Sequence, residues 1–267
     1  MHKDAPGFTR YAGAPVALVL AETLEAATEG ARLLAPELET EPARIGFEAA
    51  ETYEPPFVGF GSPTKTVTGD IEAGFAAARH VVEVAIETPL QYHNAMEPHA
   101  IVAQWEGGRL TLDTPSQAIV MSRPMFAAYF GIPPENVHIR SPYLGGGFGS
   151  KAVLNAPQIL ACLAARKTGR PVKLVLSRGQ MYGPVGHRAA TRQRLKLGIG
   201  SDGRLTALAH HAVSSTSSFD DFLEPAANAS LNTYACPAIS ASHEGSRWDT
   251  GTPGAMRRRA ISCFHEG

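Results

Sequence analysis

The chain has 267 residues, of which 44% are hydrophobic, enough to bury a core in one or two domains. Charged residues make up 18% and the formal net charge is -1, a balance that disfavours nucleic acid or an anionic membrane surface as the main partner. We expect no membrane span, because no stretch approaches the roughly 20 apolar residues that a spanning helix needs, and no signal peptide.

The first 55 residues have the pattern of a small α/β unit. Residues 15–20 (PVALVL) form an apolar run typical of a strand, and a second strand is expected at 44–48. Between them, Thr23 is expected to cap a helix that reaches residue 34. Such a βαβ fragment has too few strands to close its own sheet. Residues 53–68 are rich in proline and glycine, which indicates a connector.

From residue 70 onward, strands and helices alternate with hairpins, which predicts a mixed α+β fold. A helix over residues 116–130 is interrupted at Pro124 and closed by Gly131, and another opens at Asn155 and ends at Gly169. A short helix is expected at 71–79. Strands are expected at residues 81–87, 100–105, 109–112, 137–141, 172–177, 192–197 and 205–214.

A glycine-rich stretch, residues 145–151 (GGGFGSK), lies between an expected strand and an expected helix. Consecutive glycines allow positive φ angles and close backbone approach, so peptide N–H groups can converge on an anionic or oxo ligand. Ser150 stands where a P-loop and a dinucleotide fingerprint would each need a further glycine, so both common nucleotide motifs fail. A tight irregular turn packed against a sheet remains the structural alternative.

Five motifs occur in order along the chain. They are PVALVLAETLEAA (15–27), TPLQYHNAMEPHAIVAQW (88–105), TPSQ with LGGGFGSK (114–117 and 144–151), GRPVKLVLSRGQMYGPVGHR (169–188) and LKLGIGSDGRLTAL (195–208). Together they resemble the molybdopterin-binding subunits of the xanthine dehydrogenase and aldehyde oxidase family, nearest to its bacterial aldehyde-oxidising branch. The resemblance implies the end of an α/β hammerhead domain over residues 1–55, a linker over 56–69, part of the first molybdopterin-binding domain over 70–257, and an aberrant tail over 258–267.

The resemblance also implies which residues meet the cofactor, a molybdenum ion held by a pterin, with no protein side chain as a direct metal ligand. Gln117 matches a glutamine that hydrogen-bonds the oxo group, a task that suits an amide because it donates without titrating. The expected cofactor-binding residues are Gln117, Gly146, Gly147, Phe148, Gly149 and Arg257. The expected lining of the substrate funnel is Phe148, Ala152 and Glu224.

Two departures from the family pattern disfavour a purine substrate. Ala152 stands where purine-oxidising members carry a glutamate after the loop lysine, and Pro225 stands where they carry an arginine. Without those charged groups the funnel is more apolar, which suits aromatic or aliphatic aldehydes. The resemblance therefore implies that an aldehyde, or an N-heterocycle, is oxidised with water as the oxygen source.

The family's general base, a glutamate in a glycine-rich motif further along a longer chain, has no counterpart here. We interpret Glu97, Glu224, Asp220 and Asp221 as solvated or structural acids. The sequence after residue 257 departs from the family, so we expect a fragment that is cut at both ends and inactive by itself. A non-catalytic truncated product without cofactor is the alternative, and a phosphate-binding α/β protein is a weaker one.

The resemblance implies molybdopterin, in bacteria usually the cytosine dinucleotide form, as the cofactor. Electrons would pass to a 2Fe-2S subunit and an FAD subunit, because no cluster or flavin motif occurs in this sequence. The location would be the cytoplasm, or the periplasm by co-export with a partner subunit.

Cysteines and histidines do not indicate another metal site. Cys162, Cys236 and Cys263 form no CxxC pair, so we expect buried, reduced side chains. His93 and His99 fit no zinc spacing. The adjacent pair His210 and His211 would point to opposite faces of a strand, so the two cannot share one ion.

Overall fold

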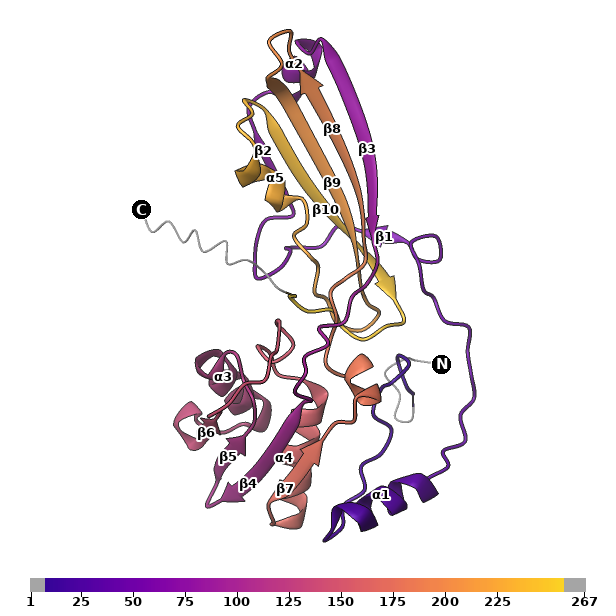
Figure 1. Cartoon of the computed structure of the whole chain (residues 1–267), viewed down its shortest axis with the longest axis vertical. Helices are drawn as coiled ribbons and strands as arrows, with labels where there is room; N and C mark the ends of the chain where they lie inside the picture. Colours follow the sequence, from indigo (N-terminus) through magenta and orange to yellow (C-terminus); the bar gives the residue numbers. More distant parts are fainter. Residues whose placement is uncertain (1–7, 257–267) are drawn as a thin grey trace. The chain divides into compact units, whose positions relative to one another are not determined.

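The computed structural model describes residues 8–256; residues 1–7 and 257–267 lie outside the described part. The architecture is mixed α+β (Figure 1), which confirms the expected fold class. Among the described residues, one compact unit holds those up to Pro42 together with Tyr92–Gly186, and a second holds Ala43–Gln91 with His187–Ala255. The domain boundaries expected at residues 55 and 69 stay a prediction. No helix within 8–256 has both the length and the apolar character needed to cross a membrane.

The first unit is built on a four-stranded sheet with the order β6-β5-β4-β7. The strands are β4 (Ala100–Glu106), β5 (Arg109–Asp113), β6 (Val137–Arg140) and β7 (Val172–Val175). β4 and β5 form the expected antiparallel hairpin, and its turn uses Gly107 and Gly108 with φ angles of 53° and 81°. β5 and β6 run parallel, with α3 (Ile119–Phe130) between them in the chain.

Helices α3 and α4 (Ala156–Thr168) supply much of the first unit's core. α4 starts with a capping box between Asn155 and Gln158 and ends at Gly169, whose φ is 65°. α3 contains Pro124 and ends at Gly131, both as expected, but it begins at Ile119 rather than at residue 116. The largest side chains buried in this core include Ile101, Leu110, Leu112, Phe126, Val137 and Cys162.

The second unit contains a six-stranded sheet in which β3, β8, β9 and β10 lie side by side (Figure 1). Its strands are β1 (Thr52–Tyr53), β2 (Lys65–Thr68), β3 (His80–Thr88), β8 (Thr191–Ile199), β9 (Leu205–Ser217) and β10 (Ile239–Trp248), and its helices are α2 (Ile71–Ala76) and α5 (Asn228–Thr233). The expected hairpin of β8 and β9 forms. β10, which the sequence pattern did not predict, runs parallel to β9 over its whole length.

The expectations for the first 55 residues are partly wrong. Helix α1 (Leu24–Leu33) forms with Thr23 as its cap, since the Thr23 hydroxyl accepts a hydrogen bond from the Ala26 amide at 3.2 Å. The strands expected at residues 15–20 and 44–48 are absent. Leu18 packs against the core of the first unit, whereas Val16 and Leu20 are 56% and 42% exposed, so most of this apolar run is neither paired in a sheet nor buried.

Candidate functional site

The glycine loop, residues 145–151, lies between β6 and α4, as the sequence predicts. Gly146 and Gly149 have φ angles of 91° and 113°, which residues with a side chain rarely adopt. Phe148 has a φ of 54° and is not a glycine, a conformation that costs about 1–2 kcal/mol. Strain of this kind persists where neighbouring contacts fix the backbone, and it is concentrated at ligand sites.

Gln117 packs directly against this loop. Its side-chain oxygen Oε1 accepts hydrogen bonds from the backbone amides of Gly149 at 2.9 Å and Lys151 at 3.3 Å, while the backbone N–H of Gln117 donates to the Lys151 carbonyl at 2.9 Å. A Cβ on Gly147 would lie only 2.2 Å from Gln117 Oε1, so this position has no room for a side chain. The loop and the glutamine singled out in the sequence therefore form one local structure.

A second contact, which sequence reasoning missed, holds the start of the loop. Glu97 Oε2 accepts hydrogen bonds from the Gly145 amide at 2.8 Å and from Lys151 Nζ at 2.6 Å. The Glu97 amide donates to the Gly145 carbonyl at 3.0 Å, and Lys151 Nζ also donates to the Glu97 carbonyl at 3.0 Å. Of the two roles expected for Glu97, a solvated acid or a structural acid, these contacts fit the structural one.

The electrostatics around Lys151 favour one charged pair. Burial raises the pKa of Glu97, but hydrogen bonds from Lys151 and Gly145 and the charge of Lys151 outweigh it, so the pKa is lower than usual. Burial and the neighbouring Lys151 charge lower the pKa of His99 to about 4. His99 Nε2 lies 3.3 Å from Ser150 Oγ. At neutral pH the site therefore holds an ionised Glu97 in an ion pair with Lys151, next to a neutral His99.

Of the three other residues expected at the site, only Ala152 lies next to the glycine loop among the described residues. The Ala152 amide donates to the Gly149 carbonyl at 3.1 Å, so Ala152 directly follows the loop in space as in sequence. Glu224 belongs to the second unit, where its carbonyl accepts from Ser214 Oγ at 3.2 Å. Arg257 lies outside the described residues. The structure thus brings Gln117, the loop residues and Ala152 together and leaves the other two roles unplaced.

Exposed apolar side chains flank the loop within the first unit. Tyr143 and Leu144 immediately precede it and are 83% and 44% exposed. Met96, next to Glu97 in the chain, is 86% exposed, and Phe148 in the loop itself is 39% exposed. Large apolar groups around a polar backbone turn are typical of a surface that receives a ligand or a partner.

Cysteines and histidines form no metal centre in the part of the chain that the structure describes. No group of three or more histidine, cysteine, aspartate or glutamate side chains within residues 8–256 converges on one point. Cys162 is fully buried, and burial raises its pKa to about 12, which makes it an inert packing residue. Cys236 is partly buried, and Cys263 lies outside the described residues.

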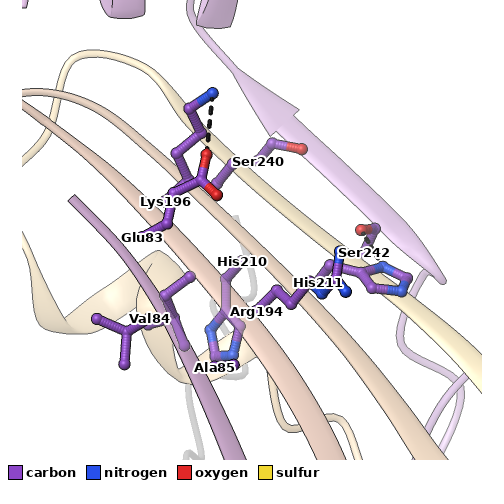
Figure 2. Close-up of a pocket in the computed structure, with 11 residues that line it drawn as sticks. Glu83, Val84, Ala85, Arg194, Lys196, His210, His211, Ser240 and Ser242 are labelled. Atoms are coloured by element: carbon purple, nitrogen blue, oxygen red, sulfur yellow. Dashed lines mark hydrogen bonds and ion pairs between the residues drawn. The ribbon is translucent and has the colours of Figure 1, made fainter. Parts of the chain in front are cut away.

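A separate hollow of about 580 Å³ lies on the sheet of the second unit (Figure 2). Lys196 Nζ and Glu83 Oε1 pair across neighbouring strands at 3.3 Å, and His211 Nδ1 lies 3.0 Å from Ser242 Oγ. The hollow is open to solvent and these polar groups satisfy one another. It lacks the apolar enclosure of a small-molecule site, so we assign no function to it.

The fold and the loop together define an α+β protein with a close-packed, glycine-rich backbone turn between β6 and α4. The molybdopterin cofactor-binding domain family matches residues 55–259, and the chain belongs to this family. It is 40% identical over 199 residues to the aldehyde oxidoreductase molybdenum-binding subunit PaoC of Escherichia coli, and 32% identical over 200 residues to the xanthine dehydrogenase of Emericella nidulans. These matches cover 74% of this chain but only 27% and 14% of the two relatives.

Solved structures of molybdenum hydroxylases have the same fold. The quinoline 2-oxidoreductase of Pseudomonas putida superposes with a TM-score of 0.75 and 27% identity, covering 89% of this chain and 32% of that one. The aldehyde oxidoreductase of Desulfovibrio gigas superposes with a TM-score of 0.74 at 22% identity, covering 89% of this chain and 27% of the other, a likeness of fold alone.

Proposed function

We propose that the glycine loop and Gln117 form the wall of a molybdopterin site in a hydroxylase that oxidises aldehydes. One observation carries this proposal. Gln117 Oε1 is occupied by the amides of Gly149 and Lys151, and no partner for Gln117 Nε2 occurs among residues 8–256. Gln117 is exposed, so this donor meets solvent and is available to a ligand, which suits an amide that donates to an oxo group.

The residues around the loop fit such a group. When bound, the molybdenum cofactor supplies two-electron oxidation of the substrate with oxygen taken from water. Gln117 would orient the cofactor through its Nε2 donor. The positive φ angles of Gly146 and Gly149 and the room that Gly147 leaves for Gln117 would let the loop backbone approach the cofactor. Phe148 would shape the substrate funnel, and Ala152 would leave its wall uncharged, which favours aldehydes over purines.

The base for this reaction is proposed to come from outside the loop. Glu97 contacts the loop, but its ion pair with Lys151 keeps its pKa low, which makes it a poor proton acceptor at neutral pH. Its side chain is also committed to the Gly145 amide. We therefore expect Glu97 to hold structure rather than to move a proton, and the 267-residue chain to be inactive by itself.

The finer assignments extend this proposal by analogy with the family. The Escherichia coli relative is named a molybdenum-binding subunit of an aldehyde oxidoreductase. By analogy we propose partner subunits that carry a 2Fe-2S cluster and FAD, and a cytosine dinucleotide on the pterin. Arg257 would add a backbone contact to the cofactor and Glu224 would line the funnel. The location would be the cytoplasm or, with a partner, the periplasm.

The experiment compares Gln117→Glu with wild type. A carboxylate keeps an acceptor for the Gly149 amide but cannot donate as an amide does, so the loop should persist while cofactor binding falls. The chain would be produced in cells that make molybdopterin, and bound molybdenum and pterin would be measured after purification. The control is Gln104→Glu, an exposed amide on β4. A folded wild-type chain that carries neither molybdenum nor pterin would contradict the proposal, as would unchanged loading of the Gln117→Glu variant.

A further inference from the structure

Lys151 ends the glycine loop with a buried positive charge. Its side chain is 1% exposed, and its Nζ has both the carboxylate and the carbonyl of Glu97 as acceptors, at 2.6 and 3.0 Å. A buried ammonium without a counter-charge is strongly disfavoured. The Glu97 carboxylate, whose Oε2 lies 2.6 Å from Lys151 Nζ, is the negative charge that compensates Lys151.

Glu97 links the two ends of the loop. It accepts from the Gly145 amide at the first residue and from the Lys151 side chain at the last. The approach is so close that a Cβ on Gly145 would lie 2.6 Å from Glu97 Cβ. Gln117 binds the amides of Gly149 and Lys151. Glu97 therefore holds the two ends of the loop, and Gln117 holds its second half.

We propose that Glu97 and Lys151 are a positioning pair that fixes the glycine loop in the conformation that receives the cofactor. That the loop receives a cofactor rests on the proposed function. That the pair fixes the conformation of the loop does not, and it can be tested without cofactor. The pair touches no reacting atom. Its effect is to hold the strained backbone at Phe148 in place, since both ends of the loop are tied to one side chain.

Hydrogen exchange of the loop amides in the 267-residue chain tests the pair without cofactor. In Lys151→Met, a side chain of similar length without charge, we expect protection of the Gly145–Ser150 amides to fall about tenfold or more, with β4 and β5 unchanged. Glu97→Gln should lose more, because it leaves the Lys151 ammonium buried without a counter-charge. The matched control is Arg140→Met, which breaks the exposed ion pair with Asp113 in the same unit and should leave the loop unchanged.

A pH series separates positioning from general stability. In wild type, protection of the loop relative to β4 should fall as Glu97 becomes protonated, whereas in Glu97→Gln it should be low and flat across the same range. Unchanged loop protection in Lys151→Met would overturn the proposal. So would an equal loss of protection in β4 and β5, because the pair would then support the whole unit rather than the loop. Cofactor loading is not measured here, so this outcome is independent of the Gln117→Glu result.

Discussion

Gln117 Oε1 lies 2.9 Å from the amide nitrogen of Gly149, and it would lie 2.2 Å from a Cβ placed on Gly147. Gln117 therefore contacts two glycines of the loop in different ways. The Gly149 amide donates to Gln117 at a position whose φ of 113° favours glycine, and Gly147 must leave space for the glutamine side chain. A loop with these two constraints tolerates very few substitutions.

Gly147→Ala should displace Gln117 and open the loop. The new methyl group would overlap the Gln117 carboxamide, and relief of that overlap should destabilise the first unit by about 1–3 kcal/mol. The measurement is urea unfolding followed by fluorescence of Trp105, which packs against the first unit's core, in a Trp248→Phe background that removes the other tryptophan. Exchange of the Gly149 amide should also accelerate.

The control for that substitution is Gly179→Ala in the same unit. A Cβ at Gly179 would have no heavy atom within 4 Å, and its φ is not positive, so the change should stay within about 0.5 kcal/mol of wild type. Equal stability of the two variants would show that Gln117 moves aside without cost.

Backbone strain at Phe148 can be tested by comparing a glycine variant with an alanine variant. Alanine is usually the more stable of the two, but at a strained position with positive φ the order should reverse. With its φ of 54°, Phe148→Ala loses the ring but keeps the strain, whereas Phe148→Gly loses both. We expect the glycine variant to be more stable than the alanine variant by about 1 kcal/mol, measured by the same urea unfolding. At Val153, which has no positive φ, alanine should be the more stable of the two. Alanine being favoured at both positions would argue against strain at Phe148.

Features with local causes were predictable from the sequence, and features with distant causes were not. The capping box at Asn155 and the left-handed Gly169 are both local signals, and α4 forms between them. β10 (ISASHEGSRW) has few β-branched or aromatic residues, and its pairing with β9 depends on packing across the sheet. Its existence therefore leaves little trace in its own sequence.

The candidate site divides in the same way. The glycine loop is visible in the sequence because several glycines in a row have a conformational meaning. Gln117 was found through the family resemblance, since nothing in its own neighbourhood marks it. The pair of Glu97 and Lys151 was missed because the two residues are 54 positions apart and contact across the fold leaves no periodic pattern.

His99 should make the first unit less stable in mild acid. Its side chain is 3% exposed, and burial together with the Lys151 charge lowers its pKa to about 4 in the folded state, against 6.5 for an unperturbed histidine. Between these values the unfolded chain binds a proton that the folded chain does not. The free energy of unfolding of the first unit is therefore highest above pH 6.5. It falls as the pH drops toward 4, by about 3 kcal/mol in total.

His99→Gln should flatten this dependence when unfolding of the first unit is followed through Trp105. Glutamine keeps a polar group near Ser150 Oγ but takes up no proton, so the slope between pH 6.5 and 4 should shrink. A slope seen by a probe of the second unit should persist, since burial and the charge of His243 lower the pKa of His210 to about 4 there. His80→Gln, a change at an exposed histidine, should leave both slopes unaltered. If the first unit retains its full slope without His99, another group must account for its loss of stability in acid.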